Sequence, residues 1–123
     1  MKKWFITLIA SISFYVTAGE VPDIKAEQLL KSDTSKWLIL DVRRAEEYAE
    51  GHVPGAVNIA HTELEDRLSE IVNFESKPVV VYCRSGYRAG KAAEILKQAK
   101  FADIRHLEGD IMGWREAGHE MAK

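Results

Sequence analysis

A short apolar run that ends at the only cysteine limits most strongly how this chain can fold. The run covers residues 78–82 and reads Pro-Val-Val-Val-Tyr immediately before Cys83. A continuous, β-branched run of this length is typical of a strand that is buried on both faces, as in parallel sheets. Cys83 is therefore predicted at the carboxyl end of an inner strand.

The segment after Cys83 predicts a helix that begins close to the sulfur. Residues 91–100 carry apolar side chains at a helical spacing, namely Ala92, Ala93, Ile95, Leu96 and Ala99. The free amide groups at the N-terminus of such a helix would point back at the cysteine. We therefore expect the loop between strand and helix to hold an anion.

Strand and helix patterns alternate along the rest of the chain. A helix is expected from Asp23, as its N-cap, with Ile24, Leu29 and Leu30 on the inner side. Further strands are expected at 37–42, 56–59 and 104–107, and further helices at 43–50, 62–72 and 111–117. Gly51 is expected to end the helix at 43–50, and a capping box at 62–65 to begin the next one. Together they predict an α/β fold, a parallel β-sheet flanked by helices on both faces.

The composition indicates a single globular domain and argues against nucleic-acid binding. The 123 residues are 46% hydrophobic and 29% charged, which is ordinary for a chain with one core. The net charge is −2, and the basic residues are interspersed with carboxylates. No basic stripe marks a nucleic-acid surface.

The first 18 residues have the pattern of a signal peptide. Two lysines follow Met1, residues 4–16 carry no charge, and small residues end at Ala18. An uncharged stretch of 13 residues is shorter than the roughly 20 that a spanning helix needs, so a retained anchor is the less favoured alternative. We expect cleavage, a mature domain over 19–123, a periplasmic or secreted location, and no membrane association after cleavage.

The residues after Cys83 favour a thiolate and an anionic substrate. Between Cys83 and Glu94 the only formal charges are those of Arg84, Arg88 and Lys91, all positive. Nearby cations and helix amides both stabilise a thiolate. The remaining loop residues also contribute: Gly86 lets successive amides converge, and the Ser85 hydroxyl can donate a hydrogen bond.

Spacing separates the possible cysteine chemistries. Four residues lie between Cys83 and Arg88, one fewer than a cysteine-dependent phosphatase or arsenate reductase loop needs to surround a tetrahedral oxyanion. A dithiol oxidoreductase would need a second cysteine. A cysteine hydrolase would need a histidine base, and we interpret the four histidines as turn, cap or surface residues: His52, His61, His106 and His119.

Several separated motifs resemble those of single-domain rhodaneses. They are Asp41-Val42-Arg43, Glu47-Tyr48, the segment 51–59, the loop 83–88, and the ending Leu107-Glu108-Gly109 with Trp114 and Ala117-Gly118. They occur in the right order, with the right loop length, and cover the chain from about residue 23 to 118.

The resemblance implies a thiosulfate sulfurtransferase in which Cys83 carries sulfane sulfur as a persulfide. The donor would be a small sulfur anion such as thiosulfate, and the acceptor cyanide, a thiol or a protein thiol, with no cofactor or metal. A non-enzymatic binding or persulfide-carrier module is the alternative. The resemblance also implies which residues bind the outer sulfur and the donor, namely the loop residues Arg84, Ser85, Gly86, Tyr87 and Arg88. Asp41 and Arg43 would support this site.

Two further expectations concern residues near the Cys83 loop. Arg43 and Glu47, four residues apart, are expected to pair. The last motif usually has paired glycines, whereas here Asp110 follows Gly109, so this turn is expected to differ locally. Tyr87 is a bulky loop residue, and it does not identify the acceptor.

Overall fold

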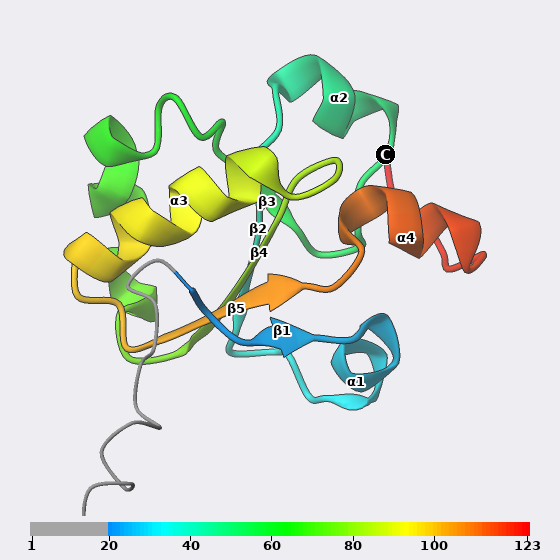
Figure 1. The fold of residues 1–123 in the computed structure, drawn as a ribbon, viewed down its shortest axis with the longest axis horizontal. Helices are drawn as coiled ribbons and strands as arrows, with labels where there is room; N and C mark the ends of the chain where they lie inside the picture. The colour runs from blue at the N-terminus through cyan, green and yellow to red at the C-terminus, as the bar shows by residue number, and fades with distance from the viewer. Residues whose placement is uncertain (1–19) are drawn as a thin grey trace, which may run out of the picture.

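A five-stranded parallel sheet forms the centre of the protein. The computed structural model describes residues 20–123. The strand order is β1-β5-β4-β2-β3, and every pairing is parallel (Figure 1). The strands are β1 (Asp23–Ile24), β2 (Leu38–Asp41), β3 (Val57–Asn58), β4 (Pro78–Tyr82) and β5 (Asp103–Leu107).

The buried central position of β4 explains its uninterrupted apolar sequence. In register, Val79 of β4 lies beside Leu38 of β2 and Ile104 of β5. Side chains from successive β4 residues enter cores on opposite faces, since Val79 and Val81 belong to one cluster and Val80 to the other. The α/β class predicted from the sequence is therefore confirmed.

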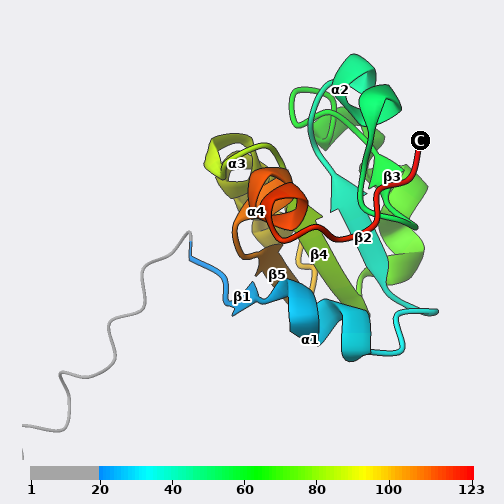
Figure 2. The same ribbon diagram turned by 90° about the vertical axis from the view of Figure 1, so that its right-hand side faces the viewer.

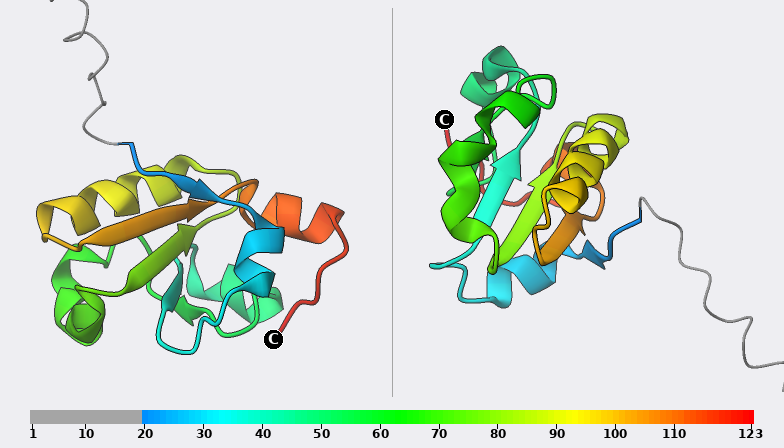
Figure 3. Two further views of the ribbon diagram at one scale, coloured as in Figure 1. Left: turned by 90° about the horizontal axis from the view of Figure 1, so that it is seen from below. Right: turned by 90° about the vertical axis from the view of Figure 1, so that its left-hand side faces the viewer.

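Helices cover both faces of the sheet (Figures 2 and 3). On one face lie α3 (Tyr87–Gln98) and the 3₁₀ segment η2 (Glu65–Phe74), which contribute Leu96 and Ile71 to the core. On the other face lie α1 (Ala26–Lys31) and α4 (Asp110–Glu116), which contribute Leu29 and Trp114. The remaining helix, α2 (Ala45–Glu50), follows β2 and ends at Gly51.

The first predicted helix was wrong at its start and on its inner face. Asp23 is not its N-cap: Asp23 and Ile24 form the edge strand β1, and α1 begins after Lys25. A two-residue strand has no periodicity that a sequence pattern could reveal. Leu29 is buried, as expected, but Leu30 is 56% exposed.

Two further helix predictions need correction. The predicted capping box at 62–65 does not form, because these residues make turns and η2 starts after Leu64 without a side-chain cap. Within η2, Ile71 is buried but Val72 is exposed, as 3₁₀ geometry with a kink at Arg67 alters the helical spacing. In addition, α3 begins at Tyr87, four residues before the predicted start.

The N-terminal prediction lies outside the part of the chain that the structure describes. The proposed signal peptide, 1–18, falls before residue 20. Within residues 20–123, none of the helices has the length and apolar character needed to cross a bilayer. At the other end, Ala122 pairs with His52, so the C-terminal segment lies beside the end of α2 (Figure 1).

Candidate active site

Cys83 lies immediately after β4, beneath the loop that leads into α3. The residue is 1% exposed. Its Sγ accepts hydrogen bonds from the backbone amides of Gly86, at 3.1 Å, and Ala89, at 3.3 Å. Gly86 has φ +126°, a conformation that L side chains rarely adopt, which explains why glycine suits the turn. The loop therefore directs two amides at the sulfur, an arrangement that stabilises a thiolate.

The first turn of α4 holds the opposite side of this loop. The amides of Ile111 and Met112 donate to the carbonyls of Cys83 and Arg84, at 3.1 and 3.3 Å. The carboxylate of Asp110 accepts the amide proton of Cys83 at 3.0 Å. Both ends of the Cys83 peptide unit are thus fixed by one helix terminus.

Asp41 and Arg43 form a buried ion pair at the end of β2. Arg43 Nη2 lies 2.7 Å from Asp41 Oδ2 and also donates to the Gly51 carbonyl at 2.8 Å. The hydroxyl of Tyr82 donates to the same carboxylate at 2.7 Å and accepts the Val53 amide proton at 3.0 Å. Burial, and then the neighbouring Asp41 charge, raise the pKa of Tyr82, so its hydroxyl remains a donor. The network joins the ends of β2 and β4.

Arg88 is bound by a carboxylate from another helix. Its Nη1 and Nη2 atoms lie 2.6 and 3.1 Å from the two Glu47 carboxylate oxygens. This hydrogen bonding lowers the pKa of Glu47 to about 2. The predicted pairing of Glu47 with Arg43 was wrong, because Arg43 turns inward to Asp41 and Glu47 extends from α2 to α3.

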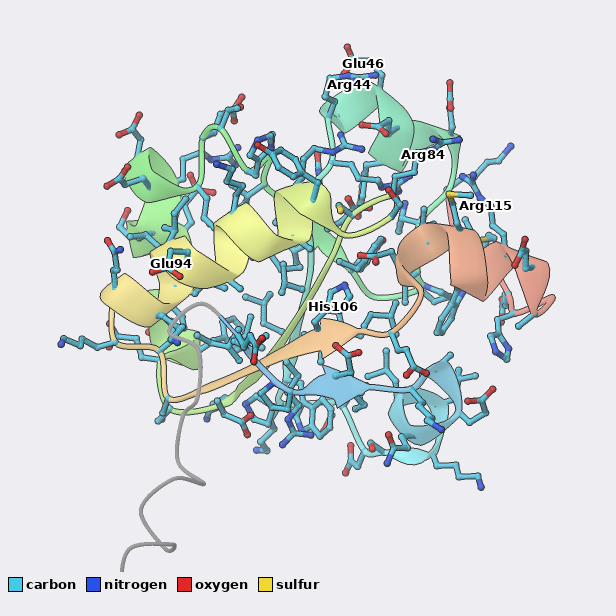
Figure 4. The ribbon with its side chains drawn as sticks, in the orientation of Figure 1. Arg44, Glu46, Arg84, Glu94, His106 and Arg115 are labelled. Atoms are coloured by element: carbon cyan, nitrogen blue, oxygen red, sulfur yellow. The ribbon has the colours of Figure 1, made fainter. Side chains whose placement is uncertain are left out.

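The other loop residues face solvent. Arg84, Ser85 and Tyr87 are exposed, with Tyr87 at 73%. The Nζ atom of Lys91 lies 5.4 Å from the centre of the Tyr87 ring. Figure 4 places Arg84 at the end of the molecule where α2 and α4 lie. The structure thus brings the predicted loop residues to the carboxyl edge of the sheet, where parallel α/β folds bind ligands.

The contact between His106 and Asp110 was not predicted from the sequence. His106 Nε2 lies 2.9 and 3.0 Å from the Asp110 carboxylate oxygens, and its Nδ1 lies 2.9 Å from Asp23 Oδ1. The hydrogen bond with Asp110, and then that with Asp23, outweigh burial and raise the pKa of His106 to about 9. The only sign of this contact in the sequence was that Asp110 follows Gly109, where the resembled motif usually has a second glycine. His52, predicted as a turn, cap or surface residue, is not on the surface: it is buried, its Nδ1 lies 2.9 Å from the Tyr48 carbonyl oxygen at the end of α2, and its ring stacks on Tyr48.

Over residues 20–123, the structure contains no group of three or more His, Cys, Asp or Glu side chains arranged to hold a metal ion.

The chain matches the family model described as a rhodanese-like domain over residues 25–117. It belongs to this family. A sulfurtransferase from Allochromatium vinosum is 34% identical over 100 residues, which is 80% of this chain and 92% of that protein. The thiosulfate sulfurtransferase PspE of Escherichia coli is 36% identical over 70 residues, 57% of this chain and 67% of that protein.

Other relatives are longer than this chain. The chain spans 41% of the HTH-type transcriptional regulator Rv0324 of Mycobacterium tuberculosis, at 38% identity, and 52% of the putative sulfur carrier protein YrkF of Bacillus subtilis, at 34% identity. Among solved structures, a rhodanese-related protein from Thermoplasma volcanium has a TM-score of 0.72 and 29% identity, covering 82% of this chain and 97% of that one. These likenesses establish a rhodanese-fold domain with relatives named sulfurtransferase or sulfur carrier.

Proposed function

We propose that this protein is a thiosulfate sulfurtransferase that carries sulfane sulfur on Cys83. The observation that carries the proposal is the contact of the Cys83 Sγ with the Gly86 and Ala89 amides at the end of β4. These donors favour the thiolate, which is the form of cysteine that attacks sulfur. They also leave the sulfur at the base of a loop whose side chains Arg84 and Arg88 are cationic.

The transfer would proceed in two displacement steps. The Cys83 thiolate attacks the outer sulfur of thiosulfate, forming a new S–S bond as the bond between the outer sulfur and the sulfonate breaks, and sulfite leaves with the electron pair. Cyanide or a thiolate then attacks the outer sulfur of the persulfide. The Cys83 thiolate leaves and is ready for another cycle. Neither step requires a net oxidant or reductant.

The loop residues have distinct roles in this proposal. The amides along residues 84–88 surround the outer sulfur, Arg84 and Arg88 bind the donor's oxyanion, and Ser85 and Tyr87 border the entrance. Asp41 and Arg43 brace the strand ends. We also retain export through residues 1–18, with a periplasmic or secreted mature protein, as a proposal.

Mass spectrometry of thiosulfate-treated protein tests the function. We expect one added sulfur atom, which cyanide removes with release of thiocyanate. The Cys83→Ser variant should gain no mass, because Cys83 is the only cysteine in the chain. An unchanged mass in the wild-type protein would contradict the sulfurtransferase reading.

The same samples distinguish the alternatives. A persulfide that forms but does not turn over with cyanide or small thiols would indicate a persulfide-carrier module. Hydrolysis of a phosphate ester or reduction of arsenate, without sulfur uptake, would indicate the phosphatase or arsenate reductase alternative. The mass of protein recovered from an exporting host would also report whether cleavage occurs after Ala18.

A further inference from the structure

The side chains of Asp110, His106 and Asp23 form a connected group behind the Cys83 loop. Asp110 belongs to α4, His106 to β5 and Asp23 to β1. Figure 4 labels His106 on β5, next to β1. Asp110 is 2% exposed and contacts both the Cys83 amide, at 3.0 Å, and His106 Nε2, at 2.9 Å. The sulfur transfer steps described above do not use this group.

The backbone at Asp110 supports a specific role for its side chain. Asp110 has φ +55°, and it follows Gly109 at φ +83°. A non-glycine residue in the left-handed region is strained, because its Cβ comes too close to the following carbonyl oxygen. The conformation directs the carboxylate to the amide of Cys83 while the next amide of α4 reaches the Cys83 carbonyl. Backbone strain of this kind is held in place where the surrounding contacts require it.

The carboxylate would be unfavourable for a thiolate if its charge were uncompensated. A negative group that hydrogen-bonds the cysteine's own amide raises the free energy of a second negative charge on the sulfur. His106 supplies the compensating charge, because its pKa of about 9 keeps it protonated at neutral pH.

Within residues 20–123, both hydrogen-bond partners of the His106 ring are acids. Asp23 faces it from β1 and Asp110 from α4, whereas β4 presents Val81 in register. The hollow next to His106 is lined otherwise by residues without titratable side chains: Val21, Gly86, Ala89, Gly90 and Ala93.

We propose that Asp110 is a positioning residue for Cys83 and that His106 is its charge partner. The Asp110 carboxylate fixes the Cys83 peptide unit, and the His106 imidazolium prevents this carboxylate from opposing the thiolate. The role of Cys83 in sulfur transfer rests on the proposed function, but the positions and charges of these groups do not.

Two substitutions separate the charge from the hydrogen bonds. His106→Gln keeps an amide donor toward Asp110 and removes the positive charge. Asp110→Asn keeps an oxygen that can accept the Cys83 amide proton and removes the negative charge. The double variant H106Q/D110N is neutral at both positions, like the wild-type pair as a whole.

NMR of protein labelled with ¹³C at the β-carbon of its only cysteine measures the thiol pKa directly. We expect H106Q to raise this pKa by about one unit, a tenfold change in the acid dissociation constant. D110N should leave it unchanged or lower it, and the double variant should return it to near the wild-type value. A purely structural role predicts instead that the double variant is at least as perturbed as H106Q.

If H106Q does not fold, the proposal can still be tested in a protein that keeps both His106 and Asp110. In the Cys83→Ser protein, the amide proton of residue 83 should shift with the ionisation of His106 near pH 9, since no thiol interferes. An amide that does not respond to His106 would overturn the proposal, as would an H106Q thiol pKa equal to that of the wild type.

Persulfide formation provides a separate kinetic readout. With thiosulfate alone, at neutral pH, H106Q should form the persulfide about tenfold more slowly and H106Q/D110N should recover most of the rate. If no protein takes up sulfur, the proposed function fails, while the NMR titrations still decide the role of Asp110 and His106.

Discussion

Arg84 and Arg88 both belong to the Cys83 loop, but their surroundings differ. Arg84 is exposed, whereas Arg88 is held by both oxygens of Glu47. Within residues 20–123, the Arg84 guanidinium has no ion-pair partner, whereas that of Arg88 is partly neutralised by Glu47, and a donor anion would meet both. Removing Arg88 would also leave the Glu47 carboxylate unpaired near the site. The two arginines should consequently make different contributions to donor binding.

Alanine substitutions test this difference. Hydrogen bonds to charged groups contribute about 1.5–3 kcal/mol, or about 10- to 100-fold in affinity. We expect Arg84→Ala to raise the KM for thiosulfate about tenfold and Arg88→Ala about a hundredfold, because the second change also exposes the Glu47 charge. Steady-state kinetics with thiosulfate and cyanide measure both.

Lys91→Ala is the matched control for these substitutions. It removes one positive charge from the same region, but the lysine is exposed and lies over the Tyr87 ring. Screened surface charges contribute less than about 1 kcal/mol, so KM should change by less than about fivefold. Equal, small effects in all three variants would argue that neither arginine binds the donor.

At the scale of the elements, strand ends and helix starts assemble the site. The end of β4 supplies Cys83, α3 supplies the amide of Ala89, and the first turn of α4 supplies Asp110. The Glu47–Arg88 ion pair links α2 to α3. Each helix is held in position by packing against the sheet. In α1 this packing can be tested with two adjacent leucines.

Two adjacent leucines in α1 provide a matched stability test. Leu29 is 4% exposed and belongs to the core on the α1 and α4 face, whereas Leu30 is 56% exposed. Deleting a buried leucine side chain costs about 2–5 kcal/mol, and most surface changes stay within about 0.5 kcal/mol. Leu29→Ala should therefore lower the free energy of unfolding by about 2–5 kcal/mol, as measured by urea denaturation.

Leu30→Ala should change this free energy by less than about 0.5 kcal/mol, since alanine is also a good helix former. Similar losses in both variants would mean that Leu30 packs inward, as the sequence pattern first suggested.

For the whole molecule, the sequence was most informative where burial is continuous. The apolar run at β4 and the alternation of elements predicted the fold class, because a strand buried on both faces needs such a run. Edge strand β1 was missed, since its two residues are defined by pairing with β5. Of the site, the Cys83 loop was predictable from local spacing. The Asp110–His106 contact was not, because the left-handed backbone at Asp110 determines where its carboxylate points.

The pH dependence of global stability should reflect two ionic contacts at opposite ends of the pH scale. The pKa of Glu47 is lowered to about 2, so its contribution is present above its ordinary value of 4.5 and is lost as the pH falls toward 2. The pKa of His106 is raised to about 9, so its contribution is complete below 6.5 and is lost as the pH rises through 9. From these two groups, stability should be greatest between about pH 4.5 and 6.5.

Urea denaturation at a series of pH values measures how the free energy of unfolding falls on the acid side (the acid limb) and on the alkaline side (the alkaline limb). Glu47→Gln should reduce the loss of unfolding free energy at acid pH and leave the loss at alkaline pH unchanged. His106→Gln should reduce the loss at alkaline pH and leave the loss at acid pH unchanged. Other carboxylates with lowered pKa values, such as Asp103, keep part of the acid limb in every variant. Glu46→Gln is the control, because Glu46 lies on the same helix but is exposed (Figure 4). An acid limb that is equally steep in the Glu47 and Glu46 variants would show that the contact between α2 and α3 does not stabilise the fold.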